Sequence, residues 1–390
     1  MRDGFQMVAR IPYPITVPKY YAVASEAATM AFLRSFGLPI PEVYGYSPVP
    51  DNVAGTEYTF MEFVRGTKLS DVWADLGDRD IASVLHQLAG LESKMMSVSL
   101  PAGGSLYYTH DMEKRDGISG ILLVENERFC VGPDVRLPLW FGRRSLIDVN
   151  RGPHLHPSNI IVSRSPDSSW QVTGLLDWQH ASILPMFLLA GIPQRLQNYG
   201  DPVSESMTQP ALPKNLDDLD EAERLPAKGL YHRRLVHYHY VKATEECSEL
   251  HHKALISHMG VLRRRLFDHA SSLWDGETLE LKVDLIESVE RWEALTGGGA
   301  QCPIVFDAED VRETKRLGKV QEGTDETMEA VRSMIGCGEE GWVPTEDYEE
   351  AMARTKELKE AALAAATSAA ERAEITKHWI FDDIDEDKYA

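Results

Sequence analysis

Short apolar runs at strand spacing alternate with longer runs at helical spacing along the first part of the chain. The loose alternation over 5–10 predicts a strand, and the spacing of apolar residues over 20–36 predicts a helix directly after it. A second strand is predicted over 57–64, and helical spacing returns over 81–98. This mixture of short strands and helices indicates an α+β protein.

Beyond residue 230 the pattern is helical almost throughout. Helices are predicted over 230–258, 261–274 and 279–296, and the glycines that follow predict a flexible break. A last long helix is predicted from Thr345 to His378, because a proline precedes it and acidic residues occupy its first turn.

The stretch 154–179 holds the most informative pattern. A β-branched run over 160–162 follows a His-Pro-Ser turn, and a second apolar run over 170–176 follows a turn rich in Ser, Pro and Asp. Two short strands joined by such a turn form a hairpin, which returns the chain close to its start. We therefore expect Asn159 and Asp177 to lie side by side. Their side-chain oxygens are ligands that Mg²⁺ accepts, so they are the candidate metal ligands.

The chain resembles the aminoglycoside phosphotransferase and choline-kinase-like proteins, and more closely the fungal altered inheritance of mitochondria phosphotransferase-like group. The resemblance covers most of the chain and rests on short segments in a specific order. These segments are FQMVARIPYPITVPKYYAVASEAATMAFLR, TFMEFVRGTKLSDVW, GSLYY, ERFCVGP, LHPSNIIV, TGLLDWQ and the acidic helical tail.

This resemblance implies a protein-kinase-like two-lobe fold and transfer of a phosphoryl group from ATP, with Mg²⁺, to an alcohol group of a small molecule. The implied division is a partial first lobe over 1–64, a second lobe over 65–300 that carries the hairpin 154–177, and an acidic helical extension over 301–390. The acceptor itself is not identified by the sequence, and neither is the oligomeric state.

The resemblance also implies roles for individual residues near the start of the chain. Arg10 stands where a kinase strand supplies the phosphate-binding cation, and Glu26 on the following helix is its natural partner. The backbone of Met61, Glu62 and Phe63 falls where the family contacts the adenine.

Two parts of the family pattern are missing. Nine residues precede Arg10, which leaves no room for the two strands of a Gly-rich loop. Pro153 runs directly into His154, where the family inserts a helical segment and places its catalytic Asp. A mis-spliced reading frame and an evolved loss would both produce this junction. We expect weak nucleotide binding and impaired transfer, with His154 at the position of the base. A catalytically inactive, pseudokinase-like binding or scaffold protein is the alternative.

Composition narrows the range of partners. The chain carries 40 Lys and Arg against 61 Asp and Glu, a net charge of −21, which argues against nucleic acids and anionic membranes. The excess is concentrated over 306–390, where 23 acidic side chains face 11 basic ones. The four cysteines lie far apart and predict neither a disulfide framework nor a zinc site.

No apolar run has the length of a membrane-spanning helix, so membrane insertion is not expected. The resembling group is associated with mitochondria, but the start of this chain has no Arg- and Ser-rich presequence. The expected location is therefore cytoplasmic or mitochondrial.

Overall fold

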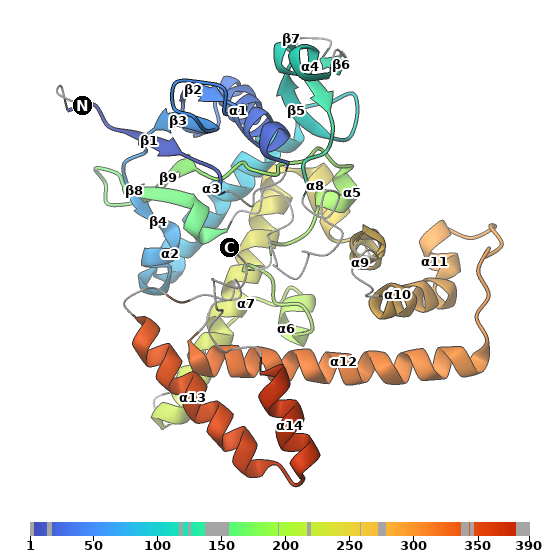
Figure 1. The fold of residues 1–390 in the computed structure, drawn as a ribbon. Coiled ribbons are helices and arrows are strands. Elements are labelled where there is room, and N and C mark those ends of the chain that lie inside the picture. Colours follow the sequence, from blue (N-terminus) through green and yellow to red (C-terminus); the bar gives the residue numbers. More distant parts are fainter. Residues whose placement is uncertain are drawn as a thin grey trace. The chain divides into compact units, whose positions relative to one another are not determined.

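The computed structural model describes residues 4–13, 18–116, 120–123, 126–136, 156–193, 195–216, 220–257, 259–271, 278–336, 343 and 347–379. Its contacts divide the chain into two units. The first unit comprises 1–284 with 291–300, and the second comprises 285–290 with 301–390. Helices and small antiparallel sheets build the first unit, which confirms the mixed α+β class (Figure 1).

The first sheet has the strand order β1-β3-β2, with β1 at Met7–Arg10, β3 at Tyr58–Glu62 and β2 at Val43–Ser47. Helix α1 (Lys19–Ser35) contacts β2 and β3. Its closely spaced alanines favour a helix and allow near approach to its neighbours, and eleven of its residues are buried. The helix ends at Ser35 with Phe36 as its cap, and the next residue, Gly37, has the positive φ of 75° that is common directly after a helix cap.

The second sheet contains the predicted hairpin. Strand β8 (Ile160–Arg164) pairs antiparallel with β9 (Trp170–Leu175), and the short strand β4 (Thr67–Lys68) pairs with the other edge of β8. The hairpin prediction is therefore confirmed. The inward side chains of Ile160, Val162 and other residues of the hairpin join the main apolar core, which fixes the hairpin's position.

A third sheet has the order β5-β7-β6, with β5 at Ser105–Tyr108, β7 at Asn126–Gly132 and β6 at Ile121–Leu123. The remaining short elements are α2 (Leu69–Val72), η1 (Trp73–Asp75), α4 (Thr109–Asp116), η3 (Pro157–Asn159), α5 (Met186–Leu189), α6 (Pro202–Glu205), α9 (Gly260–Ser271), α10 (Leu279–Glu290) and α11 (Trp292–Thr296).

The long helices α3 (Asp78–Met96) and α7 (Glu221–Cys247) pack against each other (Figure 1). Between them, the Tyr240 hydroxyl donates a hydrogen bond of 2.9 Å to the buried Glu92 carboxylate. Burial raises the pKa of Glu92 to about 7, against the opposing effect of this hydrogen bond. A titratable carboxyl therefore sits inside the helical core.

Three predicted helices are interrupted in the structure. The helix predicted over 230–258 is two helices, because the Ser248 hydroxyl accepts a hydrogen bond from the His251 N–H and caps α8 (Glu249–Leu255). The helix predicted from Thr345 to His378 is also interrupted. The Ser368 hydroxyl accepts a hydrogen bond of 3.1 Å from the Glu371 N–H and caps a separate last helix. The helix predicted over 279–296 breaks at Arg291, whose backbone is not helical.

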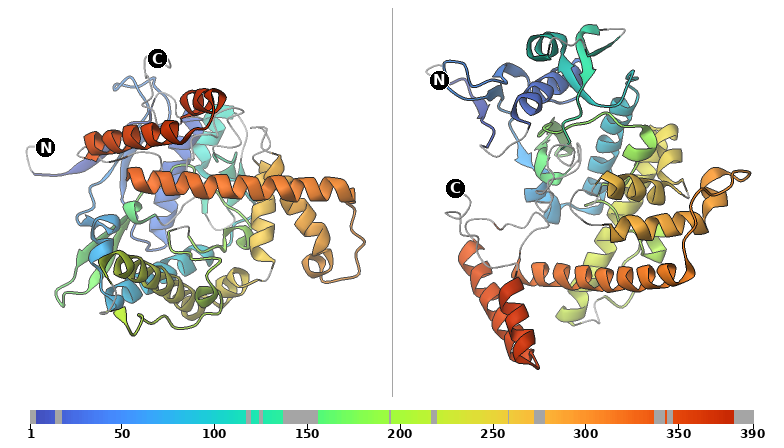
Figure 2. Two further views of the ribbon diagram at one scale, coloured as in Figure 1. Left: turned by 90° about the horizontal axis from the view of Figure 1, so that it is seen from below. Right: turned by 45° about the vertical axis from the view of Figure 1, so that its right-hand side comes forward.

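The second unit is helical over its described part. It contains α12 (Ala308–Ile335), α13 (Tyr348–Ala365) and α14 (Ala369–His378); α13 contacts both of the others (Figure 2). Asp307 caps α12 through a hydrogen bond of 2.8 Å from the Glu309 N–H. Across the described ranges of both units, no helix combines the length and the apolar character that crossing a membrane requires.

Candidate functional site

Strand β1 and helix α1 bring Arg10 and Glu26 together. Arg10 lies opposite Thr59 in the sheet, at the end of β1 that leads towards α1. Its Nη1 donates to Glu26 Oε1 at 2.5 Å. The Glu26 side chain is 3% exposed and that of Arg10 is 32% exposed. A carboxylate removed from water to this degree requires a charged partner, so the ion pair fixes the direction of the guanidinium.

The end of the hairpin supplies the second carboxylate. Arg10 Nη2 donates to Asp177 Oδ1 at 2.6 Å and to Gln179 Oε1 at 2.7 Å. The Asp177 side chain is 45% exposed, unlike that of Glu26. One guanidinium therefore joins a buried carboxylate from α1 to an accessible carboxylate from the segment after β9. We call Arg10, Glu26, Asp177 and Gln179 the Arg10 cluster.

Asn159 lies at the other strand of the hairpin. Its backbone carbonyl accepts a hydrogen bond of 2.8 Å from the Leu176 N–H, directly before Asp177. The turn of η3 is held by His156, whose carbonyl accepts from the Asn159 N–H at 2.8 Å. The structure thus brings Asn159 beside the segment that carries Asp177, as a hairpin should. Metal binding by the pair stays a prediction.

The backbone after β9 is strained. Among the described residues other than glycine, four have positive φ, and two of these are Asp177 (60°) and His180 (62°). Left-handed backbone costs an Asp or His on the order of 1 kcal/mol and is concentrated at functional sites. The buried Trp178 between them anchors the segment by donating from Nε1 to the Leu175 carbonyl at 3.0 Å. The strain is therefore held in place by core packing, and it directs Asp177 towards Arg10.

The charges of the Arg10 cluster are coupled. Burial raises the pKa of Glu26 to about 7; the Arg10 charge opposes this rise and the Asp177 charge adds to it. Burial disfavours the charged form of Arg10, but the Glu26 and Asp177 carboxylates outweigh that effect and raise the pKa of Arg10. Arg10 therefore stays a cation beside the two carboxylates.

The residues predicted to contact adenine lie on β3 and directly after it. Met61 is buried in the core, and Phe63 is 46% exposed. The backbone N–H of Glu62 donates to the Glu42 carbonyl at 2.8 Å, and the Glu62 carboxylate pairs with Arg34. The Glu62 N–H is therefore already used within the sheet. Adenine contact by these residues stays a prediction.

His154, the residue predicted at the position of the catalytic base, lies outside the described residues. Gln179 is the one member of the Arg10 cluster that sequence reasoning did not assign. Gln179 belongs to the Asp-Trp-Gln motif and lies two residues after Asp177. In an extended segment this spacing places both side chains on the same side, which is the sequence signal that could have identified Gln179. No group of three or more His, Cys, Asp or Glu side chains within the described ranges could hold a metal ion. Mg²⁺ bound with a nucleotide takes one or two protein oxygens, and Asn159 and Asp177 are the residues that could supply them.

Comparison with known proteins gives a fungal context. A subtelomeric hrmA-associated cluster protein of Aspergillus fumigatus is 25% identical over 460 positions, which cover 92% of this chain and 89% of that protein. Because the chain has 390 residues, at least 70 of those 460 positions have no counterpart in it.

Shorter similarities connect the chain to altered inheritance of mitochondria protein 9, a protein named as mitochondrial. The protein from Komagataella phaffii is 34% identical over 27% of this chain, and the one from Saccharomyces cerevisiae is 28% identical over 45% of it. These matches span 19% and 30% of the two relatives. No protein-family model matches the chain. The chain is thus similar along most of its length to a fungal cluster protein, and in part to the mitochondrial proteins.

Proposed function

We propose that this chain is a phosphotransferase-like protein with a two-lobe, kinase-like fold, which binds ATP with Mg²⁺ at the Arg10 cluster and transfers phosphoryl groups poorly. The observation that carries the proposal is the Arg10 guanidinium, which joins the buried Glu26 to the accessible Asp177. The acceptor would be an alcohol group of a small molecule.

The division of labour follows from the burial of the two carboxylates. Glu26 is inaccessible, so its role is to hold Arg10. The nitrogen that faces Asp177 can bind phosphate oxygens, since a guanidinium binds phosphate through several donors in fixed geometry. Asp177 and Asn159 would hold Mg²⁺, which neutralises charge on the phosphates. ATP with Mg²⁺ would replace the Arg10–Asp177 contact. Because that contact is lost on binding, the net free energy of binding should be small.

The lack of a carboxylate at the position of the catalytic base supports slow phosphoryl transfer. In phosphoryl transfer a carboxylate orients the acceptor hydroxyl and accepts its proton. His154 stands at that position, and an imidazole has neither the charge nor the two oxygens of a carboxylate. The alignment with the fungal relative also contains positions that this chain lacks.

A non-catalytic binding protein is the second candidate, and one observation favours it. Arg10 already neutralises Asp177 across 2.6 Å, so a metal ion must compete with a cation built into the fold.

The similarity to proteins named as mitochondrial supports mitochondria as the place where this chain acts.

Hydrolysis of ATP with water as the acceptor tests the proposed chemistry. The unchanged chain should show no phosphate release above that of Asp177→Ala. His154→Asp should give slow release, roughly tenfold above this background, since a positioned base accounts for about 10²–10⁴ in rate and only part of the site is restored. Adding Asp177→Ala to His154→Asp should abolish the gain.

His156→Asp is the matched control, because it places a carboxylate two residues away and should give no phosphate release. Robust turnover by the unchanged chain that is lost in His154→Ala would overturn the assignment of impaired transfer. Equal release by the His154→Asp and His156→Asp variants would show that the position of the carboxylate does not matter.

A further inference from the structure

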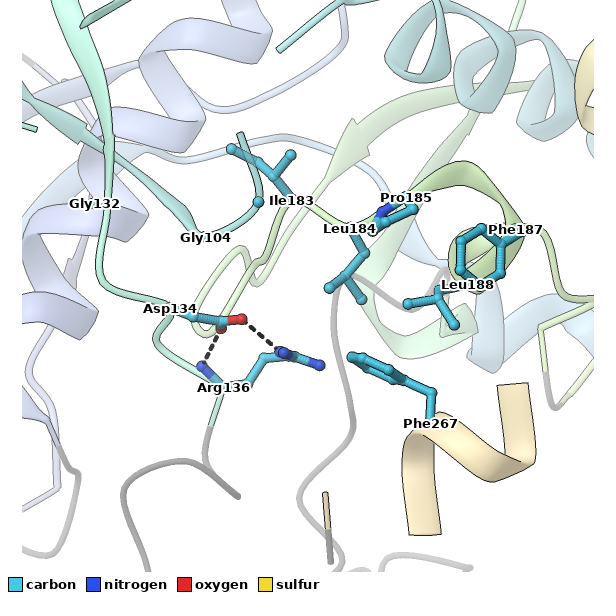
Figure 3. A pocket seen from close by; sticks show the side chains of 11 residues that line it. Gly104, Gly132, Asp134, Arg136, Ile183, Leu184, Pro185, Phe187, Leu188 and Phe267 are labelled. Carbon is cyan, nitrogen blue, oxygen red and sulfur yellow. Dashed lines mark hydrogen bonds and ion pairs between the residues drawn. The ribbon is translucent and has the colours of Figure 1, made fainter. Parts of the chain in front are cut away.

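An open cavity lies in the first unit, lined by residues outside the Arg10 cluster. It has a volume of about 420 Å³. Figure 3 shows that the loop 132–136, the segment 183–188 and Phe267 of α9 surround it. Cavities of this volume accommodate small organic ligands. We call it the Arg136 cavity.

One wall of the Arg136 cavity is apolar. This wall is formed by Phe187 and Leu188 of α5 and by Leu184, which lies two residues before that helix. None of the four residues of α5 is buried, although all four are apolar, and Phe187 is 48% exposed. These apolar side chains are exposed at the cavity. A ligand that removes them from water makes binding more favourable.

The opposite wall carries a fixed cation. Arg136 Nε donates to Asp134 Oδ2 at 2.8 Å, and the Arg136 backbone N–H donates to Oδ1 of the same carboxylate at 2.9 Å. Ser182 holds Asp134 in turn, through a hydroxyl hydrogen bond of 3.0 Å. The guanidinium carbon lies 5.3 Å from the centre of the Phe267 ring (Figure 3). Its orientation is therefore set from two sides before any ligand arrives.

The Arg136 guanidinium retains capacity for a ligand. Asp134 engages its Nε, and across the part of the chain that the structure describes no hydrogen bond joins its two terminal nitrogens to another residue. Those two nitrogens form the edge that binds a carboxylate through parallel hydrogen bonds. A singly charged anion matches this site better than a doubly charged phosphate, because the neighbouring Asp134 repels the additional charge.

We propose that the Arg136 cavity binds a small monocarboxylate with an apolar body. The carboxylate pairs with the terminal nitrogens of Arg136, and the body covers Leu184, Phe187 and Leu188. This assignment does not depend on nucleotide binding, since none of the cavity's lining residues belongs to the Arg10 cluster.

Calorimetric titration with 4-phenylbutyrate and its neutral analogue 4-phenylbutanol tests the proposal. The full chain should bind 4-phenylbutyrate at least roughly tenfold more tightly than the alcohol, because a charge-assisted pair is formed only with the acid. Arg136→Gln should abolish that preference while the alcohol still binds. Leu188→Trp, which fills the cavity from the apolar wall, should abolish binding of both probes.

Arg164→Gln is the matched control, because Arg164 also stacks on an aromatic ring, at 4.4 Å from the centre of Trp170, and lies on the β8–β9 hairpin. It should leave both dissociation constants unchanged. Thermal unfolding of each variant separates loss of the site from loss of the fold. No binding of 4-phenylbutyrate by the unchanged chain would overturn the proposal. Equal affinity for the two probes, or a preference that survives Arg136→Gln, would overturn it as well.

Discussion

Gly66→Ala should lower the free energy of unfolding of the first unit by about 3 kcal/mol. Gly66 has a φ of 148°, a backbone conformation that residues other than glycine rarely adopt. A Cβ at this position would lie 2.5 Å from Ile161 Cγ2 and 2.6 Å from the Val162 carbonyl oxygen. Because the second contact is with backbone of β8, no side-chain rotation relieves it. The strain and the overlap add, and the strand of the hairpin must shift.

Denaturant unfolding, followed by tryptophan fluorescence, measures this loss. Gly45→Ala is the control, since its added Cβ meets nothing within 4 Å and its φ is not positive. We expect that variant to change the free energy of unfolding by less than about 0.5 kcal/mol. Equal effects of the two substitutions would mean that β4 does not approach β8 as described.

Glu92→Gln should stabilise the protein by about 2 kcal/mol at pH 8 and have little effect at pH 5. Burial raises the pKa of Glu92 to about 7 in the folded state, against an ordinary value of 4.5. Between these values the folded chain holds more protons than the unfolded chain. Its free energy of unfolding therefore falls as the pH rises through this window. Glutamine keeps an acceptor for the Tyr240 hydroxyl and carries no charge.

Denaturant unfolding at a series of pH values checks this prediction. Glu92→Gln should flatten the decrease without removing it, because the pKa of Glu26 is raised in the same direction by burial. Glu113→Gln, at an exposed position on α4, is the control and should leave the slope unchanged. A slope that Glu92→Gln leaves intact would show that the buried carboxyl does not titrate in this range.

The part of the site closest in sequence to the hairpin could be predicted from pattern. Two apolar runs around a turn predict which residues pair, and pairing alone brings Asn159 beside the segment of Asp177. The pairing of Arg10 with Glu26 was implied by the resemblance to kinases and not by the local pattern, and the two side chains are in contact in the structure. The strained backbone of Asp177 and His180 has no such signal, since it results from packing around Trp178.

The spacing of apolar residues predicts neither the interruptions of the helices nor the Arg136 cavity. Ser248 and Ser368 interrupt helical patterns whose apolar spacing continues on both sides, because a hydroxyl can cap a new helix wherever the backbone turns. The cavity joins Asp134 and Arg136 to Phe267, which is more than 130 residues away in sequence. Such a contact depends on tertiary packing that no local pattern encodes.

Calorimetric titration of the full chain with ATP and Mg²⁺ tests most directly the claim that the Arg10 cluster is a nucleotide site. We expect a weak dissociation constant, in the millimolar range, because the ligand must replace the Arg10–Asp177 contact. Binding should be lost in Arg10→Ala and in Asp177→Ala. It should persist in Asp167→Ala, which removes an exposed carboxylate from the turn at the other end of the same hairpin. Binding that is unchanged in both Arg10→Ala and Asp177→Ala would show that the Arg10 cluster is not the nucleotide site.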